Sequence, residues 1–142
     1  MRPISIERRA FEGGVEQLTA IRDFVTRVVR QLGAHDDDLF ACELATDEAA
    51  SNAYEHAYTD RGGPIEVKIW REPDAIVIAV RNWGAPFDPA SVQEPDLDAP
   101  LHQRQVGGLG IFLIRKLMQD VSFAFDPIQG NTLTMRRVLT RA

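Results

Sequence analysis

The chain has 142 residues, 44% of them hydrophobic and 26% charged, with a formal net charge of -5. These values are typical of one globular domain, residues 1–142, with a core of its own. The acidic balance argues against nonspecific nucleic-acid binding, and no apolar run approaches the ~20 residues that a membrane span needs. The single cysteine, Cys42, excludes an internal disulfide and a four-cysteine metal site. Since no signal-peptide pattern is present, we expect a cytoplasmic protein.

The first part of the chain predicts one strand and two helices. Residues 4–13 alternate apolar and polar side chains, as a strand does, and meet a pair of glycines. From Val15 to Gly33 apolar residues recur every three or four positions, which predicts an amphipathic helix that ends at the glycine. The aspartates at 36–38 can cap a second helix, which we expect to run to about Tyr58.

The second part of the chain predicts a hairpin, a long loop and a closing helix with two strands. The hairpin strands are expected at 64–70 and 75–83. Because the chain is continuously apolar from Ala75 to Val80, we expect a central strand that is covered on both faces. Residues 83–110 are rich in proline and glycine, and a loop of this length in a compact domain is usually functional or disordered. The remaining helix and strands are expected at 111–120, 121–127 and 132–139.

This order of elements indicates an α+β fold. Strands joined by hairpins favour a mixed, mostly antiparallel sheet with the helices on one face, which is a two-layer α/β sandwich. Strict alternation of strand and helix is missing, so a doubly wound parallel sheet is disfavoured. We interpret the loop at about 84–107 as a lid within this single domain.

The second predicted helix carries a carboxylate, an amide and an imidazole at steps of four residues. Glu48, Asn52 and His56 would then lie on nearly one face of the helix, among alanines. The amide oxygen of Asn52 is a hard ligand suited to Mg²⁺, and Glu48 could accept a proton from a hydroxyl group or water that attacks a phosphate. The alternative is that all three are ordinary solvated helix positions.

The exit of the apolar strand is a second candidate. Asn82 lies at the end of the strand, where a polar side chain can read the edge of a nucleotide base, and Gly84 permits close approach of the backbone. An ordinary passage from strand to loop remains the alternative.

A glycine-rich segment before the third predicted helix is the remaining candidate. Gly107, Gly108 and Gly110 precede a helix, and glycine-rich backbone at a helix N-terminus can bind phosphate through free N–H groups and the helix dipole. The segment lacks the Lys-Ser/Thr of a P-loop and does not directly follow a strand, which disfavours a dinucleotide fingerprint. Arg104 could reach a phosphate from the lid, or it is a solvated loop residue; a flexible hinge and helix cap is the alternative for the glycines.

In this order, "DEAASNAYEHAY", "WGAPFDP" and "GGLGIFLI" resemble the N, G1 and G2 boxes of the Bergerat (GHKL) ATP-binding superfamily. More narrowly, the chain resembles the bacterial anti-sigma factor serine/threonine kinases, the RsbW and SpoIIAB group, over nearly its whole length. The resemblance implies binding of ATP and Mg²⁺ by a histidine-kinase-like ATPase domain. It implies that Glu48 is the general base, that Asn52 is the metal ligand and that His56 is structural or adjacent to phosphate. It places Gly84 near the adenine and Gly108, Leu109 and Gly110 at the phosphates, with Arg104, Gly107 and Ile111 completing the expected ATP-binding set.

At two positions of the expected base pocket the match to the superfamily is less direct. The first residue of the G1 box is normally an aspartate that accepts a hydrogen bond from the adenine amino group, and here it is Asn82. An uncharged acceptor makes a weaker hydrogen bond, so we expect lowered ATP affinity. Thr132 lies near the threonine that helps to hold the adenine in this superfamily.

The resemblance implies a cytoplasmic enzyme of transcription regulation, as in stress responses. It would phosphorylate a STAS-domain antagonist on serine or threonine and sequester a sigma factor, with homodimerisation possible and with no nucleic acid or membrane as partner. One alternative is a regulatory binding module of the same fold with weak or no ATP binding, which Asn82 favours. Another is the ATPase domain of a histidine kinase, which is disfavoured because no helical segment with a phospho-accepting histidine is found.

Overall fold

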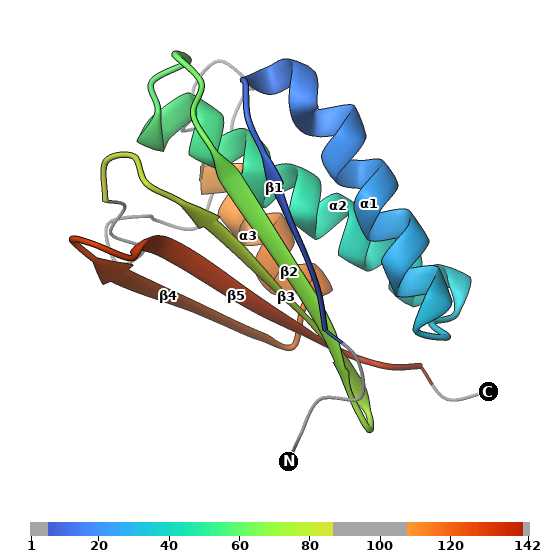
Figure 1. Cartoon of the computed structure of the whole chain (residues 1–142). Coiled ribbons are helices and arrows are strands. Elements are labelled where there is room, and N and C mark those ends of the chain that lie inside the picture. Colours follow the sequence, from blue (N-terminus) through green and yellow to red (C-terminus); the bar gives the residue numbers. More distant parts are fainter. Residues whose placement is uncertain (1–5, 87–107, 141–142) are drawn as a thin grey trace, which may run out of the picture.

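The computed structural model describes residues 6–86 and 108–140, apart from the side chains at positions 108 and 109. Its helices pack as one layer against a single sheet (Figure 1). The helices are α1, α2 and α3, at Leu18–Gln31, Asp36–Asn52 and Gly108–Leu117; a 3₁₀ turn, η1, occupies Val15–Gln17, and a π-helical segment, η2, occupies Ala53–Ala57. The strands β1 to β5 are at Ile6–Phe11, Ile65–Glu72, Ala75–Asn82, Asp120–Asp126 and Gly130–Val138. Among the described helices, none combines the length and the apolar character that crossing a bilayer requires.

The sheet has the order β1-β2-β3-β5-β4, and each neighbouring pair is antiparallel. The expected α+β two-layer fold with a mostly antiparallel sheet is confirmed, and in the described sheet all four neighbouring pairs are antiparallel. Two helices, α1 and α2, lie between β1 and β2 in the chain, and α3 and β4 lie between β3 and β5. Because two intervening elements bring the chain back to the end of the sheet that it left, the second strand of each pair runs opposite to the first. Hairpins reverse the chain direction for the other two pairs.

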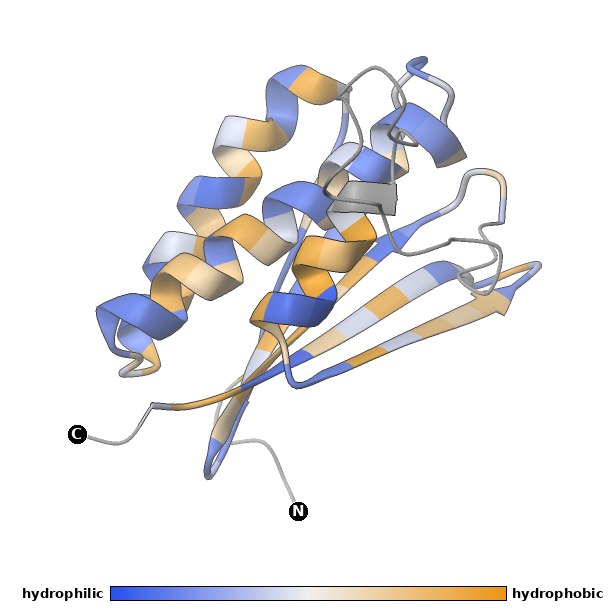
Figure 2. Cartoon of the chain, turned by 180° about the vertical axis from the view of Figure 1, so that it is seen from behind, coloured by the Kyte–Doolittle hydropathy of each residue, from blue (hydrophilic) through white to orange (hydrophobic). Residues whose placement is uncertain are grey.

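The core lies between the helices and one face of the sheet. The apolar side of α1, including Ile21, Phe24 and Val28, is buried against this face, as its three-and-four spacing predicts. Figure 2 shows apolar segments of the helices turned toward the sheet. The N-cap of α2 is His35, so the expectation that an aspartate caps this helix was wrong. The aspartates 36–38 lie in the first turn of α2, where their charges are favourable beside the positive end of the helix dipole.

Strand β3 is central, as predicted, but helices cover only one of its faces. Ile76, Ile78 and Val80 join the helix-facing core. On the other face Val77 is 4% exposed because its cross-strand partners, Trp70 and Arg136, lie beside it. The expectation that a second layer covers this face of β3 was wrong. The residues of β3 on this face are apolar because side chains of the neighbouring strands bury them.

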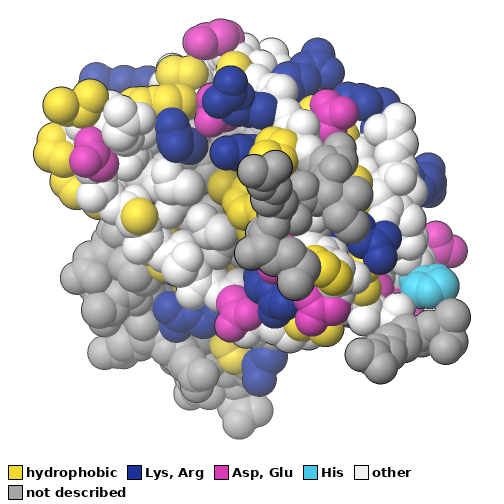
Figure 3. Space-filling view, turned by 60° about the horizontal axis from the view of Figure 1, so that its bottom comes forward, with side chains coloured by type: hydrophobic (Ala, Val, Ile, Leu, Met, Phe, Trp, Pro, Cys, Tyr) yellow, Lys and Arg dark blue, Asp and Glu magenta, His cyan; other side chains and the backbone are white. Residues whose placement is uncertain are grey.

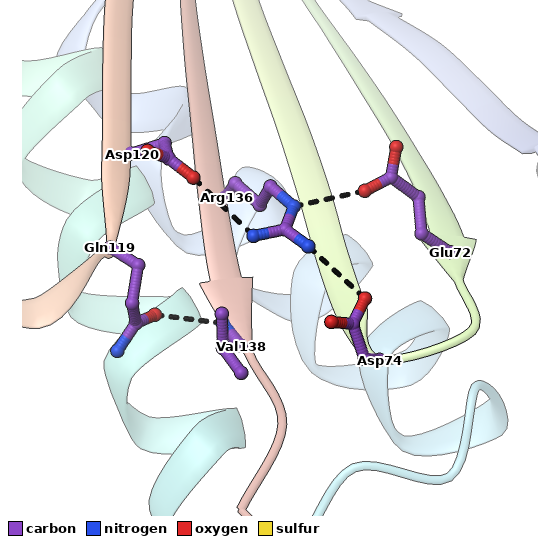
Figure 4. A network of polar contacts seen from close by, with 6 residues as sticks. All are labelled: Glu72, Asp74, Gln119, Asp120, Arg136 and Val138. Carbon is purple, nitrogen blue, oxygen red and sulfur yellow. Dashed lines mark hydrogen bonds and ion pairs between the residues drawn. The ribbon is translucent and has the colours of Figure 1, made fainter.

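At the end of the sheet away from Asn82, Arg136 holds several strands together on the uncovered face. Its guanidinium contacts Glu72 at 3.0 Å, Asp74 at 3.1 Å and Asp120 at 3.3 Å, while Gln119 accepts a hydrogen bond from the Val138 N–H (Figure 4). In the face that Figure 3 presents, basic and acidic side chains lie interspersed.

Candidate functional site

Helix α2 presents Glu48 and Asn52 at the boundary of the core. Ala45, Ala49 and Ala50 are buried against the rest of the protein. Glu48 and Asn52 lie at the edge of this buried face of the helix. Both Glu48 and Asn52 are half-buried, and neither side chain has a hydrogen-bond or ion-pair partner among the described residues. A carboxylate and an amide are thus available together, one helical turn apart, on one side of α2.

The N-terminal turn of α3 lies directly against these two side chains. A Cβ atom added to Gly110 would meet Glu48 Oε2 at 2.9 Å and the Asn52 side-chain nitrogen at 3.0 Å. Glycine is thus the residue that lets the backbone of α3 approach both groups. The free N–H groups and the positive dipole end of α3 therefore lie beside a carboxylate and an amide oxygen. Glu48, Asn52 and Gly110, which are distant along the chain, therefore lie close together, and their roles toward a nucleotide stay a prediction.

His56 does not continue the row of Glu48 and Asn52. After Asn52 the helix widens to the π form of η2, in which the Tyr58 N–H donates to the Ala53 carbonyl oxygen at 3.0 Å. A π turn takes more residues than an α turn, so a step of four no longer returns to the same face. His56 is exposed, with Nε2 3.9 Å from the Glu55 carboxylate. The helical segment ends close to Tyr58, as expected, but the expectation that His56 shares a face with Glu48 and Asn52 was wrong because the last turn is π-helical.

The turn after β3 packs on this π-helical end. A Cβ atom at Gly84 would lie 2.3 Å from the Ala57 carbonyl oxygen, and the Ala85 N–H donates to the same oxygen at 2.9 Å. Tyr58 fixes the turn as well, because its Oη accepts from the Trp83 N–H at 2.8 Å and donates to the Pro64 carbonyl oxygen at 2.6 Å. Burial raises the pKa of Tyr58, so its hydroxyl group stays protonated and able to donate. The G1-like turn is thus held at one end of the helix that carries Glu48 and Asn52.

Asn82 is on the helix-facing side of β3, but its oxygen is already engaged. Oδ1 accepts hydrogen bonds from the Gly84 N–H at 3.0 Å and from Asn131 Nδ2 at 2.9 Å. Asn131 Nδ2 also contacts the carbonyl oxygens of Gly84 at 3.1 Å and Ala85 at 3.3 Å. The two amides therefore form a bridge between the end of β3 and the start of β5.

Thr132 is not brought to this bridge. Leu133 and Met135 of β5 are in the helix-facing core, so the alternation along the strand places Asn131 on that face and Thr132 on the uncovered one. There Arg81 Nε donates to Thr132 Oγ1 at 3.4 Å. Asn131 is therefore a site residue that was not predicted, although the alternation of apolar residues at 133 and 135 places it on the buried face.

Several expected site residues fall outside what the structure describes. Arg104, Gly107 and the greater part of the proposed lid lie outside the described residues, and Gly108 and Leu109 are described through their backbone in α3 alone. Ile111 is 3% exposed and packs in the core, so its side chain anchors the start of α3 to the core. Within the described residues no group of three or more His, Cys, Asp or Glu side chains gathers as a metal site. A metal at Asn52 would take its other ligands from water and phosphate oxygens, as Mg²⁺ commonly does.

A cavity of about 590 Å³ lies elsewhere on the molecule. Its lining includes Gly13, Gly14 and Glu16 of the β1–α1 connection, Tyr54, and the turn at 60–63. Neither Glu48 nor Asn52 lines this cavity. The cavity is thus separate from the site at α2 and α3.

Comparison with known proteins agrees with this geometry. The family model described as the histidine kinase-like ATPase domain matches residues 11–137. The serine-protein kinase RsbW of Halalkalibacterium halodurans is 32% identical over 130 residues, which cover 89% of this chain and 78% of that protein. The RsbW of Bacillus cereus (strain G9842) is 28% identical over 130 residues, covering 89% of this chain and 80% of that protein.

The same fold is found in a solved structure, described as the RsbU and RsbW domains of Rv1364c from Mycobacterium tuberculosis. It superposes with a TM-score of 0.70 at 19% sequence identity and covers 99% of this chain. The match spans 34% of that longer chain, so it bears on the fold alone. From the family match and the relatives together, the chain belongs to the histidine kinase-like ATPase domain family, in the group of the RsbW serine-protein kinases.

Proposed function

We propose that this protein is an ATP-dependent protein serine/threonine kinase of the anti-sigma type. Its proposed substrate is a serine or threonine hydroxyl group of a STAS-domain antagonist, and its proposed second partner is a sigma factor. The observation that carries the chemistry is the approach of the Gly110 backbone to Glu48 and Asn52. The relatives, which bear the name of serine-protein kinases, support the class of reaction.

The residues present fit a triphosphate and a magnesium ion. The start of α3 offers backbone N–H groups to phosphate oxygens, and Gly110 leaves the space that a Cβ atom would fill. Asn52 offers a hard oxygen ligand that no described residue occupies. When bound, Mg·ATP supplies the γ-phosphoryl group and the positive charge that neutralises the phosphates.

Glu48 has the proposed role of general base. Its unpaired carboxylate would accept the proton of the substrate hydroxyl group as the new bond from oxygen to phosphorus forms. The bond between the β,γ-bridging oxygen and the γ-phosphorus breaks, and ADP leaves with the electron pair. Asn52 and the N-terminal turn of α3 would hold the triphosphate in line, so that catalysis consists mainly of positioning and charge neutralisation.

Replacement of Glu48 by glutamine tests this role. The amide keeps the size of the side chain but accepts a proton poorly, so we expect phosphotransfer to fall about 100-fold or more while Mg·ATP binding stays within about twofold. Transfer of radiolabel from ATP to a purified STAS-domain protein measures the first quantity, and calorimetry measures the second. Glu55→Gln, on the exposed face of η2, is the matched control. Full transfer by Glu48→Gln would remove Glu48 from the mechanism.

A binding module that transfers no phosphate is the second candidate, and one observation favours it. The position of the usual aspartate is a neutral Asn82 whose oxygen already accepts two hydrogen bonds. If calorimetry detects no nucleotide binding at millimolar Mg·ATP, this second function replaces the kinase.

A further inference from the structure

The cavity of about 590 Å³ beside η1 is formed where two glycine-containing segments meet. The Gly63 N–H donates to the Gly13 carbonyl oxygen at 2.8 Å, which joins the turn before β2 to the connection between β1 and α1 (Figure 1). A Cβ atom at Gly62 would lie 2.6 Å from the same oxygen, and one at Gly13 would lie 2.5 Å from Glu16 Oε1. The close approach of the two segments therefore depends on residues without side chains, and it gives the cavity preformed walls.

Tyr54 supplies a buried hydroxyl group to this cavity. The residue lines the cavity and is 0% exposed, and its Oη has no hydrogen-bond partner among the described residues. Burial, followed by the negative charge of Glu16, raises the pKa of Tyr54 to about 12, so the group is a neutral hydroxyl at neutral pH. A buried hydroxyl group without a partner is costly, so a ligand group that forms a hydrogen bond with Oη would be favoured.

Glu16 supplies a negative charge to the same cavity. The Gly14 N–H donates to Glu16 Oε1 at 2.8 Å, and this bond, together with one from the N–H of Glu16 itself, holds the pKa of the carboxyl group below its ordinary value. No basic side chain of the described residues forms an ion pair with Glu16. Asp60 adds a second carboxylate to the lining and Arg61 adds one exposed cation, so the lining is negative on balance.

An unpaired carboxylate and an unpartnered hydroxyl group favour a ligand with an ammonium group. An ammonium group has three N–H donors and no acceptor, so it can donate to the Glu16 carboxylate and to Tyr54 Oη together. The charge of Glu16 would repel an anion, and a neutral donor would form a weaker bond, because charge-assisted hydrogen bonds are roughly twice as strong as neutral ones. Val15, which is 59% exposed and also lines the cavity, offers apolar surface to the methylene groups of such a ligand.

We infer that the cavity between η1 and the turn at 60–63 binds a small aliphatic amine in its ammonium form, which Glu16 and Tyr54 recognise. The volume of the cavity is in the range of small-molecule sites. Because neither Glu48 nor Asn52 lines the cavity, this inference does not depend on the proposed kinase activity.

The test compares two small molecules that differ in charge alone. Putrescine carries an ammonium group at each end of a four-carbon chain, and butanediol has the same chain with hydroxyl groups in their place. NMR titration of the isotope-labelled protein at constant ionic strength gives both affinities and locates the site, because the amide signals of Gly14 and Gly63 lie in its walls. We expect putrescine to shift these signals saturably and to bind at least about tenfold more tightly than butanediol.

Two variants test the two recognition groups. Tyr54→Phe removes the hydroxyl group alone and should weaken putrescine binding about tenfold. Without ligand, its melting temperature should equal or exceed that of the wild type, because the buried hydroxyl group has no described partner. Glu16→Gln keeps an acceptor for the Gly14 N–H but removes the charge, and it should weaken binding about tenfold or more. Glu7→Gln makes the same change of charge at an exposed position of β1 outside the cavity and should keep the wild-type affinity within about twofold.

The inference would be overturned if putrescine did not bind saturably to the wild-type protein, or if butanediol bound equally well. Wild-type affinity in Glu16→Gln would overturn it as well, and this variant carries the test if Tyr54→Phe does not fold. An equal loss of affinity in Glu7→Gln would show that putrescine responds only to the net charge of the protein, and a lower melting temperature of free Tyr54→Phe would show that the hydroxyl group already has a partner; either result contradicts the assigned site. None of these outcomes bears on phosphotransfer, which is measured separately.

Discussion

Gly110 is the residue on which the proposed chemistry depends most closely. Its missing side chain lets the first turn of α3 approach the carboxylate of Glu48 and the amide of Asn52. The spacing of Glu48 and Asn52 and the glycines before α3 were readable in the sequence, because each follows from local geometry. The contact between them was an inference from resemblance, since no local pattern brings residues 48 and 110 together.

Gly110→Ala should lower phosphotransfer without lowering the stability of the protein. The new Cβ atom would lie 2.9 Å from the end of the flexible Glu48 side chain, which can move away. Alanine also favours a helix by about 1 kcal/mol over glycine, so we expect the melting temperature to stay equal or rise. Displacement of Glu48 should lower phosphotransfer by about 10- to 100-fold. Thermal unfolding and radiolabel transfer measure the two effects, and an unchanged rate of transfer would show that the approach of Gly110 is not required.

At the scale of elements, helix α2 continues as the π-helical segment η2, and the turn after β3 packs against η2. This contact forms the end of the candidate site opposite α3. The alternation in β5 could have identified Asn131, because Leu133 and Met135 already mark the buried face. The π turn after Asn52 was not readable, since a row of alanines and polar residues is equally compatible with an α-helix. The sequence left open whether every strand pair is antiparallel, because the relative direction of strands that a hairpin does not join depends on the path of the chain between them.

Gly84→Ala should loosen this end of the site. Its Cβ atom would lie 2.3 Å from the Ala57 carbonyl oxygen, a backbone atom that cannot turn aside. We expect a loss of about 1–3 kcal/mol in the free energy of unfolding and weaker nucleotide binding. Urea denaturation and calorimetry measure these effects.

Gly14→Ala is the control for this substitution, because its nearest contact is the movable Glu16 carboxylate at 3.0 Å. We expect a much smaller loss of stability for the control. Equal stability of the two variants would mean that the β3 turn is not held against η2 as described.

Across the whole molecule, a buried ion pair joins the first turn of α2 to the C-terminal end of β5. Asp38 is fully buried and accepts from Arg137 Nε at 2.9 Å, from the Thr140 N–H at 2.7 Å and from Thr140 Oγ1 at 2.9 Å. Arg137 also donates to the Leu117 carbonyl oxygen at 2.6 Å, at the end of α3. The network thus connects α2, α3 and β5, the elements that hold the candidate site together.

The stability that Asp38 provides should depend on pH. Burial alone would raise the pKa of Asp38, but hydrogen bonds from Thr140 and the charge of Arg137 outweigh it and hold the pKa below the ordinary value. A lowered folded-state pKa means that the stabilisation is complete above the unfolded-state pKa of about 3.9 and is lost as the pH falls through the folded-state pKa.

We expect Asp38→Asn to cost about 3 kcal/mol at neutral pH and progressively less below about pH 4. Urea denaturation over this range measures the difference. Asp120→Asn is the control, because its carboxylate is 71% exposed beside Arg136, and it should change the free energy of unfolding by less than about 1 kcal/mol. A difference between Asp38→Asn and wild type that persists unchanged into acid would contradict the assigned ion pair.

The position of a bound nucleotide tests the account most directly. A crystal structure with Mg²⁺ and a non-hydrolysable ATP analogue should place the triphosphate at the first turn of α3, with the metal about 2.1 Å from Asn52 Oδ1. A nucleotide found in the cavity between Gly14 and Gly62, or elsewhere away from Glu48 and Asn52, would contradict it.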